Sequence, residues 1–139
     1  MKNDRKNIIL QALAGLLEER NLSKITTSLL AEKSKITEAA LYRHFPSKRA
    51  IYAELFSFCD DAIFNKCGEL KKSKLAPKEK VKNAFLFFMI FIEKNKGFAR
   101  LLSREALSSD EQNVTDSVNQ FFERFELSIK QMLSEDTDN

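Results

Sequence analysis

The chain has 139 residues, of which 43% are hydrophobic and 31% are charged, and its formal net charge is +3. This length and composition predict one compact domain, or a small head on a modest second module, rather than a disordered chain. With only 3 Gly and 2 Pro there is little turn-forming material, which argues against a many-stranded β fold and favours an all-α one. The longest apolar run, residues 84–92, is too short to span a bilayer, and no signal-peptide pattern opens the chain. We therefore expect a soluble, cytoplasmic protein.

Two cysteines and one histidine leave little scope for metal or redox chemistry. Cys59 and Cys67 are eight residues apart in a helical stretch, roughly 12 Å along the axis, which is too far for a disulfide. One histidine and two separated thiols do not make the usual zinc ligand sets. The chain also lacks a glycine-rich phosphate loop and a nucleophile-elbow motif. We expect no metal, no cofactor and no enzymatic activity.

Charge is distributed unevenly along the chain. Residues 1–50 carry 10 Lys and Arg against 5 Asp and Glu, residues 51–100 carry 10 against 6, and residues 101–139 carry 3 against 9. A basic front and an acidic rear suggest that the first half meets a polyanion, although charged stretches usually only solvate a helix face.

Hydrophobic periodicity predicts four helices in the first half. The first runs from Asn3 or Asp4 to about Asn21, with an apolar stripe of Ile9, Leu13, Leu16 and Leu17, and the second covers 28–33 with Thr26 or Thr27 as its cap. The third runs from Thr37 to about His44, where Phe45-Pro46 ends it. The fourth is long, begins after Ser47 and has one apolar face, formed by Ile51, Leu55, Phe58, Ala62 and Ile63.

Three further helices are predicted after a lysine-rich loop over 71–78. The fifth contains the run 84–92, which is apolar all round and must be enclosed by other helices or by a partner. Asn95-Lys96-Gly97 is expected to end it, with Gly97 in the left-handed conformation. A shorter helix over 98–107 and a last one over about 110–133 follow, before a polar tail.

Residues 26–48, TTSLLAEKSKITEAALYRHFPSK, predict two short helices joined by a tight turn. Ala31 is small where the helices must cross, and Leu30, Ile36 and Leu41 fill the space between them. The second helix presents polar groups on its other faces, and the two capping threonines aim helix N-termini outward, which suits phosphate contact. This pattern is typical of a helix-turn-helix that binds DNA.

The same segment resembles the signature of the TetR family of DNA-binding regulators. The matching residues are Thr26-Thr27, Leu30-Ala31, Leu41-Tyr42-Arg43-His44-Phe45 and Ser47-Lys48. The family usually has Gly in the turn, where this chain has Lys35. If that position still needs a positive φ, the non-Gly residue costs on the order of 1 kcal/mol.

The resemblance implies which residues contact DNA. The family uses the tyrosine at position 42 on the phosphate backbone, and its histidine at position 44 also faces phosphate, although a lone His equally serves as a structural cap. Lys48, just inside a helix N-terminus, is unfavourable to the helix dipole unless an anion lies nearby. The implied DNA-binding residues are Thr26, Thr27, Thr37, Glu38, Ala40, Tyr42, Arg43, His44 and Lys48, on a domain of residues 1–46, with a regulatory and partner-binding domain over 47–139.

The resemblance extends to one branch of the family, the nucleoid occlusion factors, through residues 38–48, 93–97, 100–107 and 119–126. It implies a protein that binds palindromic chromosomal sites, antagonises polymers of the tubulin-like protein FtsZ and blocks septum formation over the nucleoid, and a homodimer is expected for the full-length family. The implied partner site is a groove between the fourth and fifth helices, with Phe58, Lys66, Phe87, Lys94 and Asn95. Lys66 and Lys94 stand where the branch has arginines, which keeps the charge but loses the guanidinium fork.

Two alternatives stay open. Phe85, Phe87, Phe88, Phe91 and Phe98 are core residues on base rates, or they line a pocket for an apolar effector, as in ligand-responsive TetR-type repressors. The chain could also be a helical interaction module without DNA binding. The family's usual two further C-terminal helices, which form its four-helix dimer bundle, are not among the predicted helices, so we expect an exposed apolar face on the last one.

Overall fold

The computed structural model of the protein describes residues 4–19, 25–104, 107 and 111–134. This part of the chain forms helices without strands, which confirms the predicted all-α class. The helices are α1 (Asp4–Glu18), α2 (Thr27–Lys33), α3 (Glu38–His44), α4 (Lys48–Lys72), α5 (Pro77–Lys94), α6 (Lys96–Leu102) and α7 (Gln112–Ser134).

Three helices begin at the side-chain caps that the sequence predicts. The hydroxyl oxygens of Thr26, Thr37 and Ser47 accept hydrogen bonds at 3.0–3.1 Å from the amides three residues on, at the starts of α2, α3 and α4. Pro77 lies at the start of α5, where its missing N–H would have no helical partner. The loop between α4 and α5 is shorter than expected, because α4 continues to Lys72.

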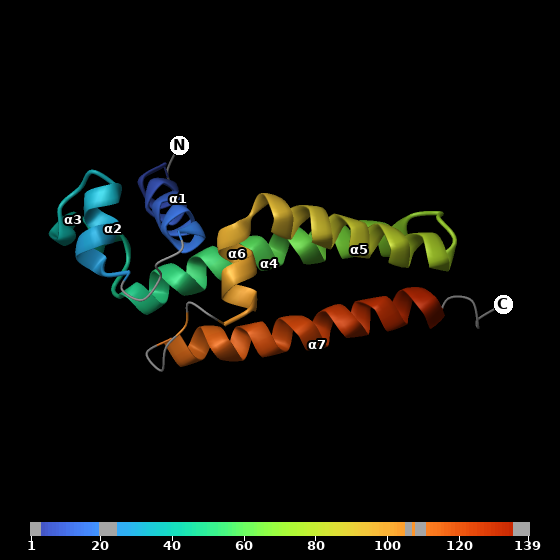
Figure 1. The fold of residues 1–139 in the computed structure, drawn as a ribbon. Helices are drawn as coiled ribbons and strands as arrows, with labels where there is room; N and C mark the ends of the chain where they lie inside the picture. Colours follow the sequence, from blue (N-terminus) through green and yellow to red (C-terminus); the bar gives the residue numbers. More distant parts are fainter. Residues whose placement is uncertain (1–3, 20–24, 105–106, 108–110, 135–139) are drawn as a thin grey trace.

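The helices form a small head at one end of a longer body (Figure 1). α1, α2 and α3 make up the head, and α4 leads from it into the body. α5 runs back beside α4, and α7 returns along both of them. α6 lies across this layer near the head and packs against α1. It is shorter than predicted, since it ends at Leu102.

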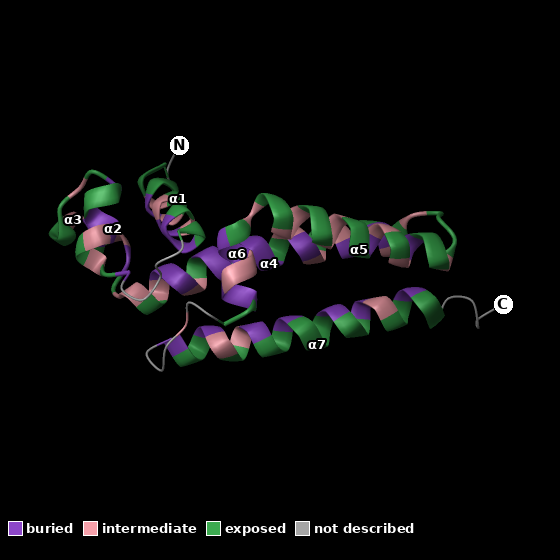
Figure 2. Cartoon of the chain, in the orientation of Figure 1, coloured by how far each residue is buried: buried purple, intermediate pink, exposed green. Residues whose placement is uncertain are grey.

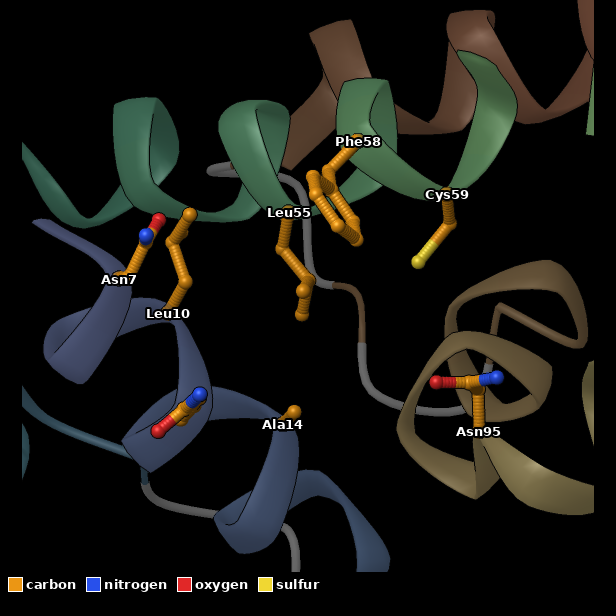
Figure 3. A pocket seen from close by; sticks show the side chains of 8 residues that line it. Asn7, Leu10, Ala14, Leu55, Phe58, Cys59 and Asn95 are labelled. Atoms are coloured by element: carbon orange, nitrogen blue, oxygen red, sulfur yellow. The ribbon is translucent and has the colours of Figure 1, made fainter. Parts of the chain in front are cut away.

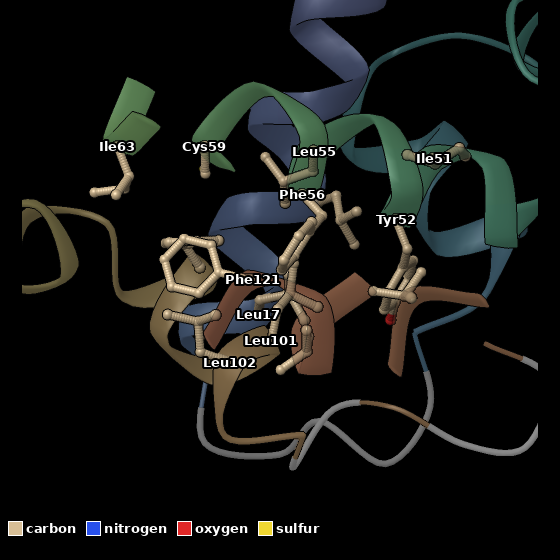
Figure 4. Close-up of a cluster of buried hydrophobic side chains, with 14 of the residues drawn as sticks. Leu17, Ile51, Tyr52, Leu55, Phe56, Cys59, Ile63, Leu101, Leu102 and Phe121 are labelled. Atoms are coloured by element: carbon tan, nitrogen blue, oxygen red, sulfur yellow. The ribbon is translucent and has the colours of Figure 1, made fainter. Parts of the chain in front are cut away.

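One continuous core joins the head to the body (Figures 2 and 4). The predicted stripe of α1 is buried in it, as are Leu30, Ala31 and Leu41 of the head. Phe121 of α7 is fully buried at the centre of the body, where its ring packs 5.9 Å from Phe98 and 6.2 Å from Phe56 between centroids. Most of the phenylalanines therefore serve packing.

Gly97 was expected to end α5 in a left-handed conformation, and this prediction is wrong. No glycine in the described residues has a positive φ, and Gly97 is a buried residue of α6. A Cβ at this position would lie 2.8 Å from the backbone oxygen of Ala14 in α1. The absence of a side chain thus allows α6 to approach α1, which is a packing requirement rather than a turn requirement.

The apolar surface of α5 is only partly enclosed. Phe85, Leu86, Met89 and Ile90 are exposed, with Met89 at 62%. The other helices of the chain therefore cover only part of α5, and the alternative that a partner covers the rest stays a prediction. The predicted apolar surface on the last helix is present, because Phe122, Leu127 and Leu133 of α7 are exposed. None of the described helices is long and apolar enough to cross a membrane.

Candidate nucleic-acid interface and partner groove

The turn between α2 and α3 has a Schellman motif centred on Lys35. Its φ is 60°, and its amide donates to the Glu32 carbonyl at 3.1 Å, while the Ile36 amide donates to the Ala31 carbonyl at 3.0 Å. This 5→2 and 6→1 pair ends α2 in the usual way, with a lysine in the position that favours glycine. The helix-turn-helix geometry is therefore intact, and the condition for the conformational cost of a non-Gly residue, a positive φ at Lys35, holds.

Three of the predicted DNA-binding residues meet on the exposed side of the head. The Thr27 hydroxyl lies 3.0 Å from a Glu38 carboxylate oxygen, to which it donates, and 3.1 Å from the Tyr42 hydroxyl. Tyr42 is 47% exposed, so the prediction that it lies off the buried face is confirmed. These contacts fix the N-terminus of α2 beside one face of α3 and orient the tyrosine ring.

Lys48 contacts the head from the first position of α4. Its ammonium donates a 3.0 Å hydrogen bond to the backbone carbonyl of Ile25, just before α2, and lies 5.9 Å from the centroid of the Tyr52 ring. A cation at a helix N-terminus is repelled by the helix dipole. The Ile25 carbonyl offsets part of this cost, so Lys48 has a structural contact that the sequence did not reveal.

The remaining predicted DNA-binding residues lie on the same part of the head. Thr26 and Thr37 are the exposed caps of α2 and α3. Ala40 and Arg43 lie on α3, half-buried and exposed respectively, and His44 is half-buried at its end. The structure thus gathers all nine residues around the two short helices and the start of α4.

The predicted partner residues fall into two neighbouring groups. In the first, the Lys66 ammonium of α4 lies 5.7 Å from the centroid of the Phe87 ring of α5, a cation–π geometry that joins the two helices. Lys66 also lies 4.0 Å from the carboxylate of Glu69. Phe87 is half-buried, with its ring 6.0 Å from that of Phe91 between centroids.

In the second group, Phe58 and Asn95 line a shared pocket of about 330 Å³ (Figure 3). Phe58 is 68% exposed, so it does not share the buried face of α4 with Ile51 and Leu55, as its spacing had suggested. The Asn95 amide nitrogen donates to the Phe91 carbonyl at 2.8 Å. Lys94, the last residue of α5, is exposed beside Asn95 and belongs to neither contact group.

Part of this pocket was not predicted. Its other wall is α1, through Asn7, Leu10, Gln11 and Ala14, and α4 adds Leu55 and Cys59 to the lining (Figure 3). The only sequence signal was Gly97, whose small size brings α6 against Ala14 of α1. Burial raises the pKa of the Cys59 thiol to about 12, which keeps it neutral and unreactive at physiological pH. Among the described residues, no three His, Cys, Asp or Glu side chains are grouped to hold a metal ion.

The helix-turn-helix head on a helical body defines a regulator of the TetR class. The family model for bacterial regulatory proteins of the tetR family matches residues 9–55, and that for the tetracyclin repressor-like, C-terminal domain of the SlmA-like type matches residues 78–137. The fold is also similar to that of a Clostridium perfringens protein titled "putative fatty acid metabolism regulator". The TM-score is 0.75, at 18% identity, over 95% of this chain and 73% of that one.

Sequence similarity to curated relatives shows which branch of the TetR class the chain belongs to. The chain is 37% identical over 135 residues to the nucleoid occlusion factor SlmA of Vibrio atlanticus, a match that covers 96% of this chain and 69% of the relative. The SlmA proteins of Marinobacter nauticus and Vibrio cholerae are 37% and 36% identical over the same shares of the two chains. The chain therefore belongs to the SlmA family of nucleoid occlusion factors, as the sequence had indicated.

Proposed function

We propose that the protein is a DNA-binding nucleoid occlusion factor that antagonises FtsZ polymers and so blocks septum formation over the chromosome. The observation that carries this proposal is the similarity to named nucleoid occlusion factors over 96% of the chain, across both head and body. The protein acts by binding rather than catalysis, in the cytoplasm and on the nucleoid. Residues 1–46 form its DNA-binding domain, and residues 47–139 form its partner-binding domain.

The contacts in the head divide into two kinds. Thr26, Thr27, Thr37, Tyr42, His44 and Lys48 bind phosphate, while Ala40 and Arg43 lie closest to the base edges. Arg43 is exposed on the short helix, and arginine reads guanine edges in the major groove through two hydrogen bonds. Glu38 accepts a hydrogen bond from the Thr27 hydroxyl and so holds the phosphate-binding groups in place. A palindromic site requires two heads roughly 34–36 Å apart, which the full-length family is expected to supply as a homodimer.

A matched pair of lysines tests the DNA contacts. Lys48→Ala should weaken binding to all sequences alike and lower the slope of log affinity against log salt by about one unit. Lys72→Ala makes the same change of charge at the other end of α4, roughly 36 Å away at 1.5 Å per residue, and should leave the slope unchanged. Relaxed sequence preference with an unchanged slope in Lys48→Ala would contradict this division. Because Lys48 also binds the Ile25 carbonyl, circular dichroism must show that the head remains folded.

The groove between α4 and α5 supports binding of FtsZ. The exposed ring of Phe58, the Lys66 ammonium over the Phe87 ring and the exposed Lys94 supply an apolar surface and positive charge, which fits an acidic, partly disordered segment with an apolar anchor. Such a segment would order itself against the groove on binding. Binding at this site, remote from the outer side of the head, allows DNA and FtsZ to be held together.

Substitution of the exposed aromatic residue gives the sharper test of the groove. Phe58→Glu should abolish FtsZ binding and retain DNA binding, because its side chain is mostly outside the core. Leu75→Glu places the same charge on another exposed apolar residue, in the loop before α5, and should bind FtsZ normally. Phe87→Glu should behave as Phe58→Glu does; if it unfolds the chain, Phe87 is a core residue. Normal FtsZ binding by folded Phe58→Glu would place the site elsewhere.

A second candidate function is a ligand-responsive repressor, which the pocket of about 330 Å³ favours because this volume lies at the lower end of the range for small-molecule sites. Genome-wide mapping of bound sites separates the two functions. Sites scattered over the chromosome and absent near the terminus support nucleoid occlusion. Occupancy of one or two promoters, released by an apolar compound, supports the repressor.

A further inference from the structure

The exposed apolar surface of α5 continues onto α7, which runs beside it in the opposite direction along the body (Figure 1). We call this surface the α5–α7 face. Its six apolar residues, all exposed except the half-buried Ile129, are Phe85, Leu86, Met89, Phe122, Ile129 and Leu133. We propose that a second copy of this chain binds to the α5–α7 face across a two-fold axis, so that α5 and α7 of the two copies form a four-helix bundle.

The α5–α7 face is turned away from α4 and from the predicted partner groove. The Phe87 ring lies beside a lysine of α4, and Met89, two residues further on, lies on the opposite side of α5 at about 100° per residue. Arg124 of α7 bonds to α4, and Phe122 precedes it by two residues. The face is therefore separate from the proposed DNA and FtsZ contacts. The dimer bundle that the family resemblance implies uses two further helices, and neither α5 nor α7 belongs to it.

Each helix contributes a row of four residues to the face, and the two rows have the same spacing. The row on α5 is Lys78, Lys82, Phe85 and Met89, and the row on α7 is Phe122, Glu126, Ile129 and Leu133. Both rows advance by four, three and four residues, a spacing that keeps side chains on one side of a helix. The rows can therefore meet residue by residue when the helices that carry them run parallel.

A two-fold axis perpendicular to the face provides this parallel arrangement. Because α5 and α7 are antiparallel within one chain, the axis lays α5 of one copy parallel to α7 of the other. Lys82 is then opposite Glu126, Phe85 opposite Ile129, and Met89 opposite Leu133. The same contacts occur twice in the dimer, since the axis relates the two copies.

Charge complementarity favours a second copy as the occupant of this face. α5 carries four lysines against two glutamates, whereas α7 carries three acidic residues against one arginine and one lysine. Contact of α5 with α7 of the other copy therefore joins a basic helix to an acidic one at both halves of the interface. Lys82 is exposed and has no ion pair among the described residues, and the exposed Glu126 lies 3.9 Å from Lys130 at the surface. Both side chains are thus accessible to a second copy.

The size of the face suits a reversible dimer. α5 has 18 residues and is roughly 27 Å long at 1.5 Å per residue. Two helices side by side are about 20 Å wide, so the face covers on the order of 500 Å² on each copy. The dimer would then bury about 1,000 Å² in total, at the lower limit for a specific interface. We therefore expect the dimer to form and dissociate with protein concentration rather than to be obligate.

Sedimentation equilibrium of the full chain over a range of concentrations tests the proposal. The wild type should show a monomer–dimer equilibrium, and Met89→Glu should raise its dissociation constant at least about tenfold, because it places a charge against Leu133. Met89 is 62% exposed, so the substitution spares the core. Leu127→Glu is the matched control, since Leu127 is an exposed apolar residue of α7 outside the face. It should change the dissociation constant less than about twofold.

An exchange of charges tests which residues meet, and it applies even if Met89→Glu fails to fold. Lys82→Glu and Glu126→Lys each place like charges at both copies of the 82–126 contact, and each should raise the dissociation constant about fivefold or more. An equal mixture of the two variants should associate as the wild type does, because both contacts of the mixed dimer then join opposite charges. Lys74→Glu, in the exposed loop before α5, makes the same charge change as Lys82→Glu and should not weaken the dimer.

Three results would overturn the proposal. The first is a wild type that stays monomeric at every concentration. The second is a Met89→Glu variant that keeps the helical circular dichroism of the wild type and dimerises equally well. The third is a mixture of Lys82→Glu and Glu126→Lys that associates no better than either variant alone. None of these results depends on DNA or FtsZ, so the proposed function is tested separately.

Discussion

Asp60 of α4 and Arg124 of α7 form a two-oxygen ion pair across the body of the molecule. A single guanidinium nitrogen of Arg124 donates to both carboxylate oxygens, at 3.0 and 3.1 Å, and the guanidinium lies 4.0 Å from the centroid of the Phe64 ring. The Asp60 side chain is 12% exposed and that of Arg124 is 51% exposed. Burial raises the pKa of Asp60, and Arg124 opposes that rise. The pair therefore links α4 to α7 with an almost buried acid.

Removal of Arg124 should lower the stability of the protein, because the buried carboxylate of Asp60 then lacks its partner. We expect Arg124→Leu to lower the free energy of unfolding by about 1–3 kcal/mol, because a buried acceptor is left without its donor. Urea denaturation at pH 7 measures this change. Lys130→Leu removes an exposed lysine 3.9 Å from Glu126 on the same helix, and should cost no more than about 0.5 kcal/mol.

The pH dependence of the stability of Arg124→Leu shows whether its loss comes from the unpaired Asp60 carboxylate or from lost packing of the arginine side chain. Without Arg124 the folded-state pKa of Asp60 rises further above its unfolded value, so the folded state binds the proton more tightly than the unfolded state does. The Arg124→Leu variant should thus recover part of the lost stability as the pH falls from about 7 to 5. A deficit that stays constant over this range would assign the effect to the stacking on Phe64.

The head was predictable because its signals are local. Capping threonines and a serine, the break at Phe45-Pro46 and the apolar spacing in α1 all act within a few residues of their own position, and the structure confirms them. The resemblance in the signature residues likewise depends only on consecutive positions. The body was less accessible, because the outward direction of Phe58 and the exposure of α5 depend on which helices pack against them.

The α1 wall of the pocket and the Asp60–Arg124 pair could not be predicted from the sequence. Asp60 and Arg124 are separated by 64 residues, and a charged residue on either helix reads equally well as part of a solvated face. Gly97 gave a misleading signal, because a glycine after a helix suits a left-handed turn as well as a close helix contact. Only the crossing of α1 and α6 decides between them.

Lys35 offers a stabilising substitution. Its φ of 60° costs a non-Gly residue roughly 1 kcal/mol, so we expect Lys35→Gly to raise the free energy of unfolding by about 0.5–1 kcal/mol. Lys33→Gly, at the exposed end of α2, should instead lower it by a similar amount, since glycine is a poor helix former. Both changes remove one positive charge, and urea denaturation compares them. A loss of stability in Lys35→Gly would show that the lysine side chain has a role in the turn.

Gly97 and Gly68 form a second informative pair. Gly97→Ala should destabilise the protein by about 1–3 kcal/mol, because its Cβ meets the backbone of Ala14 and neither helix moves easily. Gly68→Ala, in α4, meets nothing within 4 Å and should be stabilising by up to about 1 kcal/mol. The same substitution thus has opposite signs at the two sites. A neutral Gly97→Ala would mean that α6 can shift away from α1.

The buried phenol of Tyr52 should make the free energy of unfolding fall at high pH. Burial, with a smaller contribution from the charge of Glu111, raises its pKa to about 12 in the folded protein. An unfolded tyrosine ionises near pH 10, so above that pH the unfolded state loses a proton that the folded state keeps. Stability should therefore fall as the pH rises from about 10 to 12, by roughly 2–3 kcal/mol at 1.36 kcal/mol per pKa unit.

The chain has only two tyrosines, so the effect of Tyr52 can be distinguished from that of Tyr42 by single substitutions. Tyr42→Phe leaves Tyr52 as the sole tyrosine, and its absorbance at about 295 nm should titrate near pH 12, provided that the protein stays folded. Tyr52→Phe keeps the buried ring but removes the hydroxyl, so its stability should fall less steeply between about pH 10 and 12 than that of Tyr42→Phe. Because burial also raises the pKa of the Cys59 thiol to about 12, a residual decline remains in both variants. Equal slopes in the two variants would mean that the Tyr52 hydroxyl ionises as readily in the folded as in the unfolded chain, against its burial in the core.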